Sequence, residues 1–157
     1  MELSESSKVW FFQSASELSE AQRLKIASAL DEFLVGWKAH GASLFAGYEI
    51  LHNRVVLVAV DEEKALATGC SIDKLTHLFK DLGAQLNIDF FNRTIVHYEH
   101  NEEIHSTPLN QFWAMRKAEL IHDETVILDT TVRTLGEFKN SWRKKFSESW
   151  HAEVWGR

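Results

Sequence analysis

The chain has 157 residues, 45% of them hydrophobic and 25% charged, and a formal net charge of −6. This size and composition are typical of a folded globular domain and exclude an intrinsically disordered protein. The acidic balance works against nucleic-acid binding, which needs Lys and Arg contacts to phosphates. Apolar runs such as Val55–Val60 are far shorter than the roughly 20 residues that span a bilayer, so no membrane span is expected.

The opening stretch MELSESS and the cysteine content both bear on the compartment. The stretch has neither a basic cap nor an apolar run, so we expect no secretory signal. A single cysteine allows no intramolecular disulfide, which agrees with a reducing compartment. The sequence therefore predicts a cytoplasmic protein that is stabilised by packing.

The first hundred residues alternate between strand patterns and helix patterns. Lys8–Gln13 is aromatic and β-branched without alternation, which predicts a central strand covered on both faces. Ser19 and Gln22 form a capping box for a helix that runs to His40, and Gly41 supplies its stop. The later elements are expected as strands at 44–50 and 54–60 around a left-handed turn at Asn53, a helical stripe from Ile72 to Leu86, and an alternating strand at Thr94–His100.

The order of these elements, βαββαβ, predicts the α+β fold class. It is the order of a ferredoxin-like core, in which an antiparallel sheet has helices on one face and its first and third strands lie in the middle. The two runs without polar alternation are the first and third strands, so pattern and topology agree. We expect residues 8–100 to form this core within a single domain, 1–157, and residues 101–157 to pack on it as a C-terminal β/α extension.

The C-terminal third is expected to add two helices and a strand. Thr107 and Pro108 open a short helix, and Thr125–Val132 reads as a strand. Thr134–Glu137 is a capping box for a final helix, which would carry the basic cluster Arg143–Lys145 on its solvated face. Its apolar residues recur every four positions from Phe138 to Val154, and this stripe winds by about 160° around a helix. The helix is therefore predicted to break at Ser147–Ser149.

Three stretches, AVDEEKALATGCSID, VWFFQS and SESWH, together resemble a family of small uncharacterised bacterial cytoplasmic proteins. Some members carry the label "ABC transporter ATPase". The resemblance extends over nearly the whole chain but implies no activity that could be carried over. An ATPase of that type needs G-x-x-x-x-G-K-[ST] to hold phosphates, and the sequence has no such run. We therefore expect no ATP hydrolysis.

Cys70, in ATGCSIDKL, permits two interpretations. If a helix begins at Ser71, free N–H groups and the helix dipole favour the thiolate, and a thiol-dependent enzyme or redox sensor could use Cys70 with His97 or His151 as base. In the other interpretation Cys70 precedes the N-cap and packs as a mostly buried staple. We favour the staple, because Asp61, Glu62, Glu63 and Asp73 lie close in sequence and oppose a thiolate.

The same turn suggests an anion site, and the histidines suggest a metal site. Thr68, Gly69 and Ser71 offer hydroxyl and N–H groups at a helix start, where small anions bind. His97 and His100 point to opposite faces of a strand, so HYEH supplies too few ligands for a metal. We expect no metal and no other cofactor.

The tail is rich in tryptophan and is expected to dock on its own domain or on a partner. Trp142, Trp150 and Trp155 are the candidate partner-binding residues. A sheet with one face to cover and so apolar a tail predicts a homodimer. The function that we expect is a non-catalytic binding or interaction protein with a protein or small-molecule partner, with the thiol and anion functions as alternatives.

Overall fold

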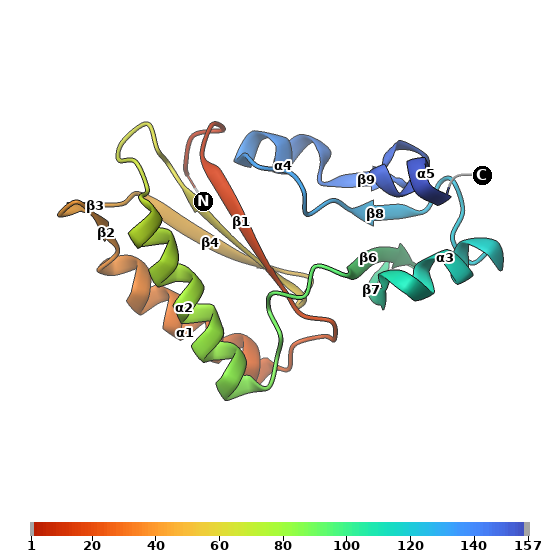
Figure 1. Ribbon diagram of the computed structural model, residues 1–157, viewed down its shortest axis with the longest axis horizontal. Helices are drawn as coiled ribbons and strands as arrows, with labels where there is room; N and C mark the ends of the chain where they lie inside the picture. Colours follow the sequence, from red (N-terminus) through yellow and green to blue (C-terminus); the bar gives the residue numbers. More distant parts are fainter. Residues whose placement is uncertain (1, 156–157) are drawn as a thin grey trace. The chain divides into compact units, whose positions relative to one another are not determined.

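The computed structural model describes residues 2–155, apart from the side chain of Trp155, and divides into two compact units (Figure 1). The first unit holds the chain up to Asn92 together with Arg133–Gly136, and the second holds Arg93–Val132 and the chain from Glu137 onward. Helices and antiparallel sheets confirm the α+β class. The boundary at Asn92 falls inside the segment 8–100 that was expected to form one core. Across residues 2–155, no helix has the length and apolarity that crossing a bilayer requires.

The first unit is built around a three-stranded antiparallel sheet in the order β1-β5-β4. Its elements are β1 (Lys8–Gln13), α1 (Glu20–Val35), β2 (Lys38–Ala39), β3 (Ala42–Ser43), β4 (Ala46–Leu51), β5 (Val55–Val60) and α2 (Gly69–Leu86). All six residues of β5 are buried, as its uninterrupted apolar run predicts for a strand covered on both faces, and β5 pairs with β1 on one edge and with β4 on the other. The central place of the third predicted strand is therefore confirmed.

Helices α1 and α2 lie on the same face of this sheet (Figure 1). The core between these helices and the sheet contains side chains from four elements, among them Phe12 of β1, Leu30 of α1, Val58 of β5 and Phe79 of α2. Each such side chain stabilises the fold by about 1.5–3 kcal/mol through loss of contact with water. Trp37 joins the same core, and its indole Nε1–H donates to the carbonyl of Ser71 at 2.9 Å.

The start of α1 is confirmed, but its predicted end is wrong. Ser19 and Gln22 form the reciprocal capping box. The helix ends at Val35, before the residues up to His40 that were expected to belong to it. His40 and Gly41 both have a positive φ and form the turn of the β2–β3 hairpin, so Gly41 serves a hairpin and does not stop the helix.

The expected fourth strand does not join this sheet, so the ferredoxin-like topology is not confirmed. Residues Ile95–His100 form β6, which belongs to the second unit. The outer edge of β1, where the fourth strand would pair, is bonded by two other segments: Gln13 N–H donates to the carbonyl of Phe90, and Val9 N–H to that of Arg133. The first predicted strand is therefore not flanked by strands on both sides.

The second unit contains a four-stranded sheet in the order β7-β6-β8-β9. Its elements are β6 (Ile95–His100), β7 (Glu103–Pro108), α3 (Leu109–Lys117), β8 (Val126–Leu128), α4 (Leu135–Ser141, which begins in the first unit), β9 (Arg143–Lys145), the 3₁₀ turn η1 (Phe146–Glu148) and α5 (Trp150–Trp155). Sequence analysis missed β7, which pairs with β6 through a left-handed turn at Asn101 and Glu102. Phe112, Ile127 and Phe146 are fully buried in its core.

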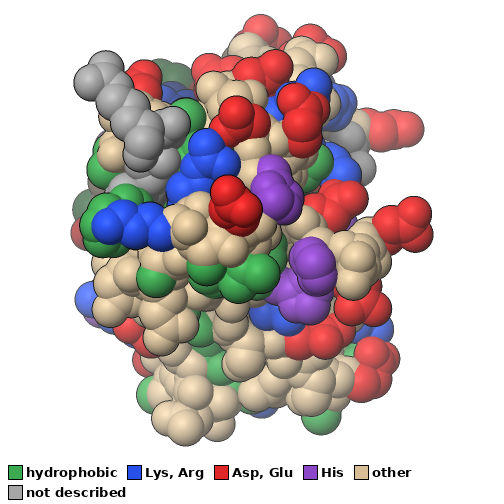
Figure 2. All heavy atoms as spheres, turned by 90° about the vertical axis from the view of Figure 1, so that its right-hand side faces the viewer, with side chains coloured by type: hydrophobic (Ala, Val, Ile, Leu, Met, Phe, Trp, Pro, Cys, Tyr) green, Lys and Arg blue, Asp and Glu red, His purple; other side chains and the backbone are tan. Residues whose placement is uncertain are grey.

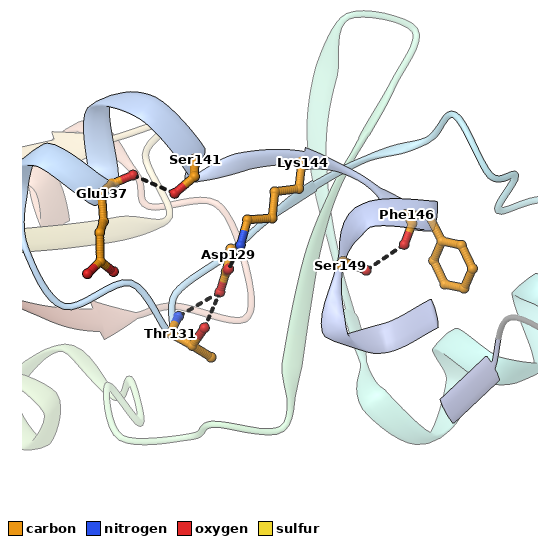
Figure 3. Close-up of polar contacts among 7 residues, drawn as sticks. All are labelled: Asp129, Thr131, Glu137, Ser141, Lys144, Phe146 and Ser149. Carbon is orange, nitrogen blue, oxygen red and sulfur yellow. Dashed lines mark hydrogen bonds and ion pairs between the residues drawn. The ribbon is translucent and has the colours of Figure 1, made fainter. Parts of the chain in front are cut away.

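The expected final helix is broken earlier than predicted. Helix α4 ends at Ser141, whose hydroxyl donates to the carbonyl of Glu137 (Figure 3). Arg143–Lys145, expected on a helix, form a strand that pairs with β8. Apolar residues that recur every four positions wind around a helix, so one continuous helix could not bury all of them against the same core. As a strand, Arg143–Lys145 instead forms backbone hydrogen bonds with β8. Of the predicted break at Ser147–Ser149, Ser147 and Glu148 lie within η1, and Ser149 separates η1 from α5.

Candidate functional site

The turn between β5 and α2 contains Cys70 and is closed by a capping box. Thr68 is the N-cap: its hydroxyl accepts from Ser71 N–H, and the Ser71 hydroxyl accepts from Thr68 N–H. The helix thus begins two residues before Ser71, and Cys70 is its second residue. There the thiol is exposed to solvent, so the expected buried staple is wrong. The buried residue of the turn is Ser71, which is 1% exposed.

The capping box also uses the groups that were expected to bind an anion. The Ser71 hydroxyl is bonded to both the N–H and the carbonyl of Thr68, each at 2.8 Å. The Thr68 hydroxyl in turn accepts from Ser71 N–H at 3.2 Å. Of the predicted set, the hydroxyls and the Ser71 amide are therefore engaged within the turn. Anion binding at Thr68, Gly69 and Ser71 stays a prediction.

The two histidines that were considered as bases for Cys70 belong to the second unit, and both are buried. His97 lies on β6, and its Nδ1 is 2.8 Å from the Ser106 hydroxyl on β7. His151 is stacked on Trp150, with ring centroids 3.8 Å apart. Burial lowers the pKa of His151 to about 4, against a smaller opposing effect of Asp129, so its imidazole is neutral at pH 7. A catalytic role of either histidine stays a prediction.

The basic cluster Arg143–Lys145 is neutralised by acidic side chains of its own unit. Arg143 pairs with Glu99, Lys144 with Asp129 and Lys145 with Glu124. Figure 3 shows Asp129 between Lys144 and Thr131, whose N–H and hydroxyl both donate to it. Burial alone would raise the pKa of Asp129, but these hydrogen bonds outweigh it and hold the pKa below its usual value. The three side chains therefore form ion pairs within the second unit, and little unpaired positive charge is left to bind a phosphate.

The tryptophans of the tail differ in exposure. Trp142 is 6% exposed, whereas Trp150 is 41% exposed although it stacks on His151. The side chain of Trp155, the third candidate, lies outside the described residues. The tail thus contributes Trp142 to the packed interior and presents part of Trp150 to solvent. A partner-binding role for the three stays a prediction.

Histidine side chains gather beside Asp and Glu side chains on the face shown in Figure 2. On the β6–β7 hairpin, the rings of His100 and His105 have centroids 5.9 Å apart, and His105 lies 3.9 Å from Glu103. Residues 2–155 nevertheless contain no group of three or more His, Cys, Asp or Glu side chains arranged to hold a metal ion.

The end of α2 carries a pocket that sequence analysis did not anticipate. Its volume is about 520 Å³, it is open to solvent, and it lies entirely in the first unit. Three of its lining residues are phenylalanines, Phe79, Phe90 and Phe91, and a fourth, Phe12, contacts two of them from outside the lining. Phe12 stacks on Phe79, Phe79 meets Phe90 edge to face, and Phe91, which is 37% exposed, meets Phe12 edge to face. The remaining lining is contributed by Lys80, Gly83, Ala84, Asn87, Ile88 and Asp89.

The shape of the pocket follows from how α2 ends. Asn87 is left-handed, with φ 56°, and its N–H donates to the carbonyl of Gly83. Ile88 N–H bonds the same carbonyl at 3.0 Å, which folds the chain back over the helix. A Cβ at Gly83 would lie 2.5 Å from the carbonyl oxygen of Ile88, so this close approach needs glycine. The signal available in the sequence was the pair Phe90–Phe91, which begins four residues after the last residue of the helix.

Comparison of the chain with protein-family models, curated proteins and solved structures finds no match. The bacterial family resemblance and the cytoplasmic location therefore stay predictions. The geometry of the described residues is what supports a functional proposal.

Proposed function

We propose that this protein is a non-catalytic binding protein whose ligand is a small organic ammonium compound with an aromatic or aliphatic body. The observation that carries the proposal is the pocket at the end of α2. Its volume of about 520 Å³ lies in the range of small-molecule sites, and its wall combines phenylalanines with a few polar groups. Phe91 offers an accessible ring to an apolar ligand.

The fixed charges at the pocket favour a cation. The carboxyl end of α2 carries partial negative charge, and its last turn contains no basic residue to offset it. The Asp89 side chain is held at the pocket because its Oδ1 accepts from Phe91 N–H at 3.0 Å. A phenylalanine face attracts a cation further. Lys80 opposes these effects, but it is an exposed, flexible side chain that can turn toward water.

A titration with three matched probes tests the proposal: benzylamine, benzyl alcohol and benzoate. They share the ring and differ in the charge of the head group. We expect benzylamine to bind with a dissociation constant on the order of millimolar, as suits so few heavy atoms, and benzoate to bind most weakly. Amide chemical-shift changes in a ¹⁵N–¹H spectrum should be confined to residues 79–91.

Three variants identify the site and the head-group effect. Ala84→Trp fills the pocket and should abolish the shifts. Asp89→Asn keeps the Oδ1 acceptor but removes the charge, so benzylamine should lose its advantage over benzyl alcohol. Asp81→Asn, an exposed change on the same helix outside the lining, is the control and should change neither. Absence of site-confined shifts with all three probes, or tightest binding of benzoate, would contradict the proposal.

The exposed thiol supports a second candidate function, a redox sensor that uses Cys70. Exposure is a requirement for such a thiol, and Cys70 meets it on the first turn of an 18-residue helix. Oxidation by dilute peroxide tests it: a sensor thiol should form sulfenic acid faster than free cysteine does, as measured by mass spectrometry after trapping. A rate equal to that of free cysteine would remove this candidate.

A further inference from the structure

The outer edge of β4 carries backbone groups that no described residue binds. Extending the β4–β5 register pairs Phe45 with Asp61, and Asp61 N–H donates to the Phe45 carbonyl at 2.8 Å. Hydrogen-bonded pairs alternate along an antiparallel ladder, so the residues between them point their N–H and C=O groups away from β5. The outward groups belong to Ala46, Tyr48 and Ile50, and within residues 2–155 no hydrogen bond to them is found.

The same alternation holds on the other edge of the sheet, where the outward positions are occupied. The outward amides of Val9 and Gln13 on β1 donate to the carbonyls of Arg133 and Phe90. Before β4, the next outward position along the chain is Leu44, and its N–H is already used, because it donates to the carbonyl of Trp37 at 3.0 Å. The open stretch of the sheet edge is therefore Ala46–Ile50.

This stretch also lacks the features that protect natural sheet edges. It has no lysine, no proline and one charged residue, Glu49. The edges of the sheet in the second unit differ: β9 consists of Arg143–Lys145, and β7 ends in Pro108. An unprotected row of donors and acceptors is a template for a further strand.

We propose that β4 pairs antiparallel with β4 of a second copy of this chain, with the two-fold axis at Tyr48. Tyr48 then lies opposite the partner's Tyr48, and Ala46 opposite the partner's Ile50. Each copy contributes three donors and three acceptors, so all of the outward groups are satisfied by six hydrogen bonds between the copies. The two three-stranded sheets become one continuous sheet.

Charge and ladder length select this register over its neighbours. The two-fold axis places the same face of both sheets on the same side of the dimer. Opposite residues must therefore share a face, so their residue numbers differ by an even number. An axis at Glu49 would set Glu49 against the partner's Glu49, a repulsive contact. An axis at Gly47 would require the N–H of Leu44, which Trp37 already binds. With the axis at Tyr48, Glu49 faces the partner's Gly47 and the ladder uses only the free groups.

The mass in solution tests the proposal, because the chain has a mass of 18.1 kDa. Sedimentation at micromolar concentration should give twice that mass. Ile50→Pro removes an N–H that no described residue binds, so the fold should persist while dimerisation weakens by at least about thirtyfold through two lost hydrogen bonds. Ile50→Ala keeps the N–H and is the matched control, which should remain dimeric. Circular dichroism confirms that both variants are folded.

Disulfide trapping tests the register itself. In a Cys70→Ser background, Ala46→Cys and Ile50→Cys chains should crosslink to each other when mixed under mild oxidation. Neither should crosslink to itself, because like residues lie about 13 Å apart along the strands and a disulfide needs Cα atoms within about 7 Å. A monomeric parent at 100 µM, a dimer that Ile50→Pro leaves intact, or efficient self-crosslinking of either chain would overturn the proposal. The pocket variants do not touch β4, so failure of one proposal leaves the other standing.

Discussion

Acidification should destabilise the second unit through His151. The imidazole is 4% exposed, and burial lowers its pKa to about 4, whereas an unfolded histidine has a pKa near 6.5. Between these values the unfolded chain binds a proton that the folded chain excludes. Stability from this group is therefore fully present above pH 6.5 and is lost as the pH falls toward 4.

The difference between the two pKa values gives the size of the effect. At about 1.4 kcal/mol per pH unit it corresponds to a loss of about 3 kcal/mol between pH 6.5 and pH 4. His151→Leu introduces an apolar side chain of similar volume that cannot titrate. The free energy of unfolding of the parent should fall relative to this variant across that window, as measured by urea denaturation from pH 4 to pH 7.5.

Phe112→Leu supplies the control, because the Phe112 ring lies 5.3 Å from that of His151 and does not titrate. This variant should be less stable than the parent by a similar amount at every pH. Asp129, whose pKa is lowered, loses its own stabilising effect as the pH falls through that lowered value, but it does so in parent and variants alike. Parallel curves for the parent and His151→Leu from pH 4 to pH 7.5 would refute the reasoning.

Two further predictions concern α2. Gly83→Ala should lower the free energy of unfolding by at least about 1 kcal/mol, because the new Cβ would lie 2.5 Å from the Ile88 carbonyl oxygen, although alanine normally favours a helix interior. Gly69→Ala is the control and should be neutral or stabilising, because its Cβ would meet nothing within 4 Å. Equal shifts in Tm for the two variants would contradict this prediction. Cys70→Ser should change stability by less than about 0.5 kcal/mol because the thiol is exposed, and iodoacetamide should label the native protein completely by mass spectrometry; a thiol that reacts only in denaturant would show the exposure to be wrong.

The sequence by itself determined the elements whose signals are local. Ser19 and Gln22 start α1 by capping each other's backbone, and the apolar run Val55–Val60 becomes the buried middle strand. These outcomes depend on residues within one helical turn or on the periodicity of one strand. Such short-range interactions are present in the pattern before any tertiary contact forms.

Only the tertiary structure decided how the strands pair. β6 has the alternation of a half-exposed strand, which is equally compatible with the edge of β1 and with β7. The left-handed turn at Asn101 and Glu102 gives β6 a local partner, while β1 receives Phe90 and Arg133. Strand periodicity says which face of a strand is buried, but it carries no information about the neighbour that binds its edge.

The candidate sites depended on the same kind of information. A start of α2 at Gly69, two residues before Ser71, turned Cys70 from a buried position to an exposed one, because each residue rotates a helix by about 100°. The pocket exists because Ile88 folds back on Gly83, and the edge of β4 is open because no described residue hydrogen-bonds its outward backbone groups. Both arise from contacts between segments, whose energies depend on distances that a linear pattern does not contain.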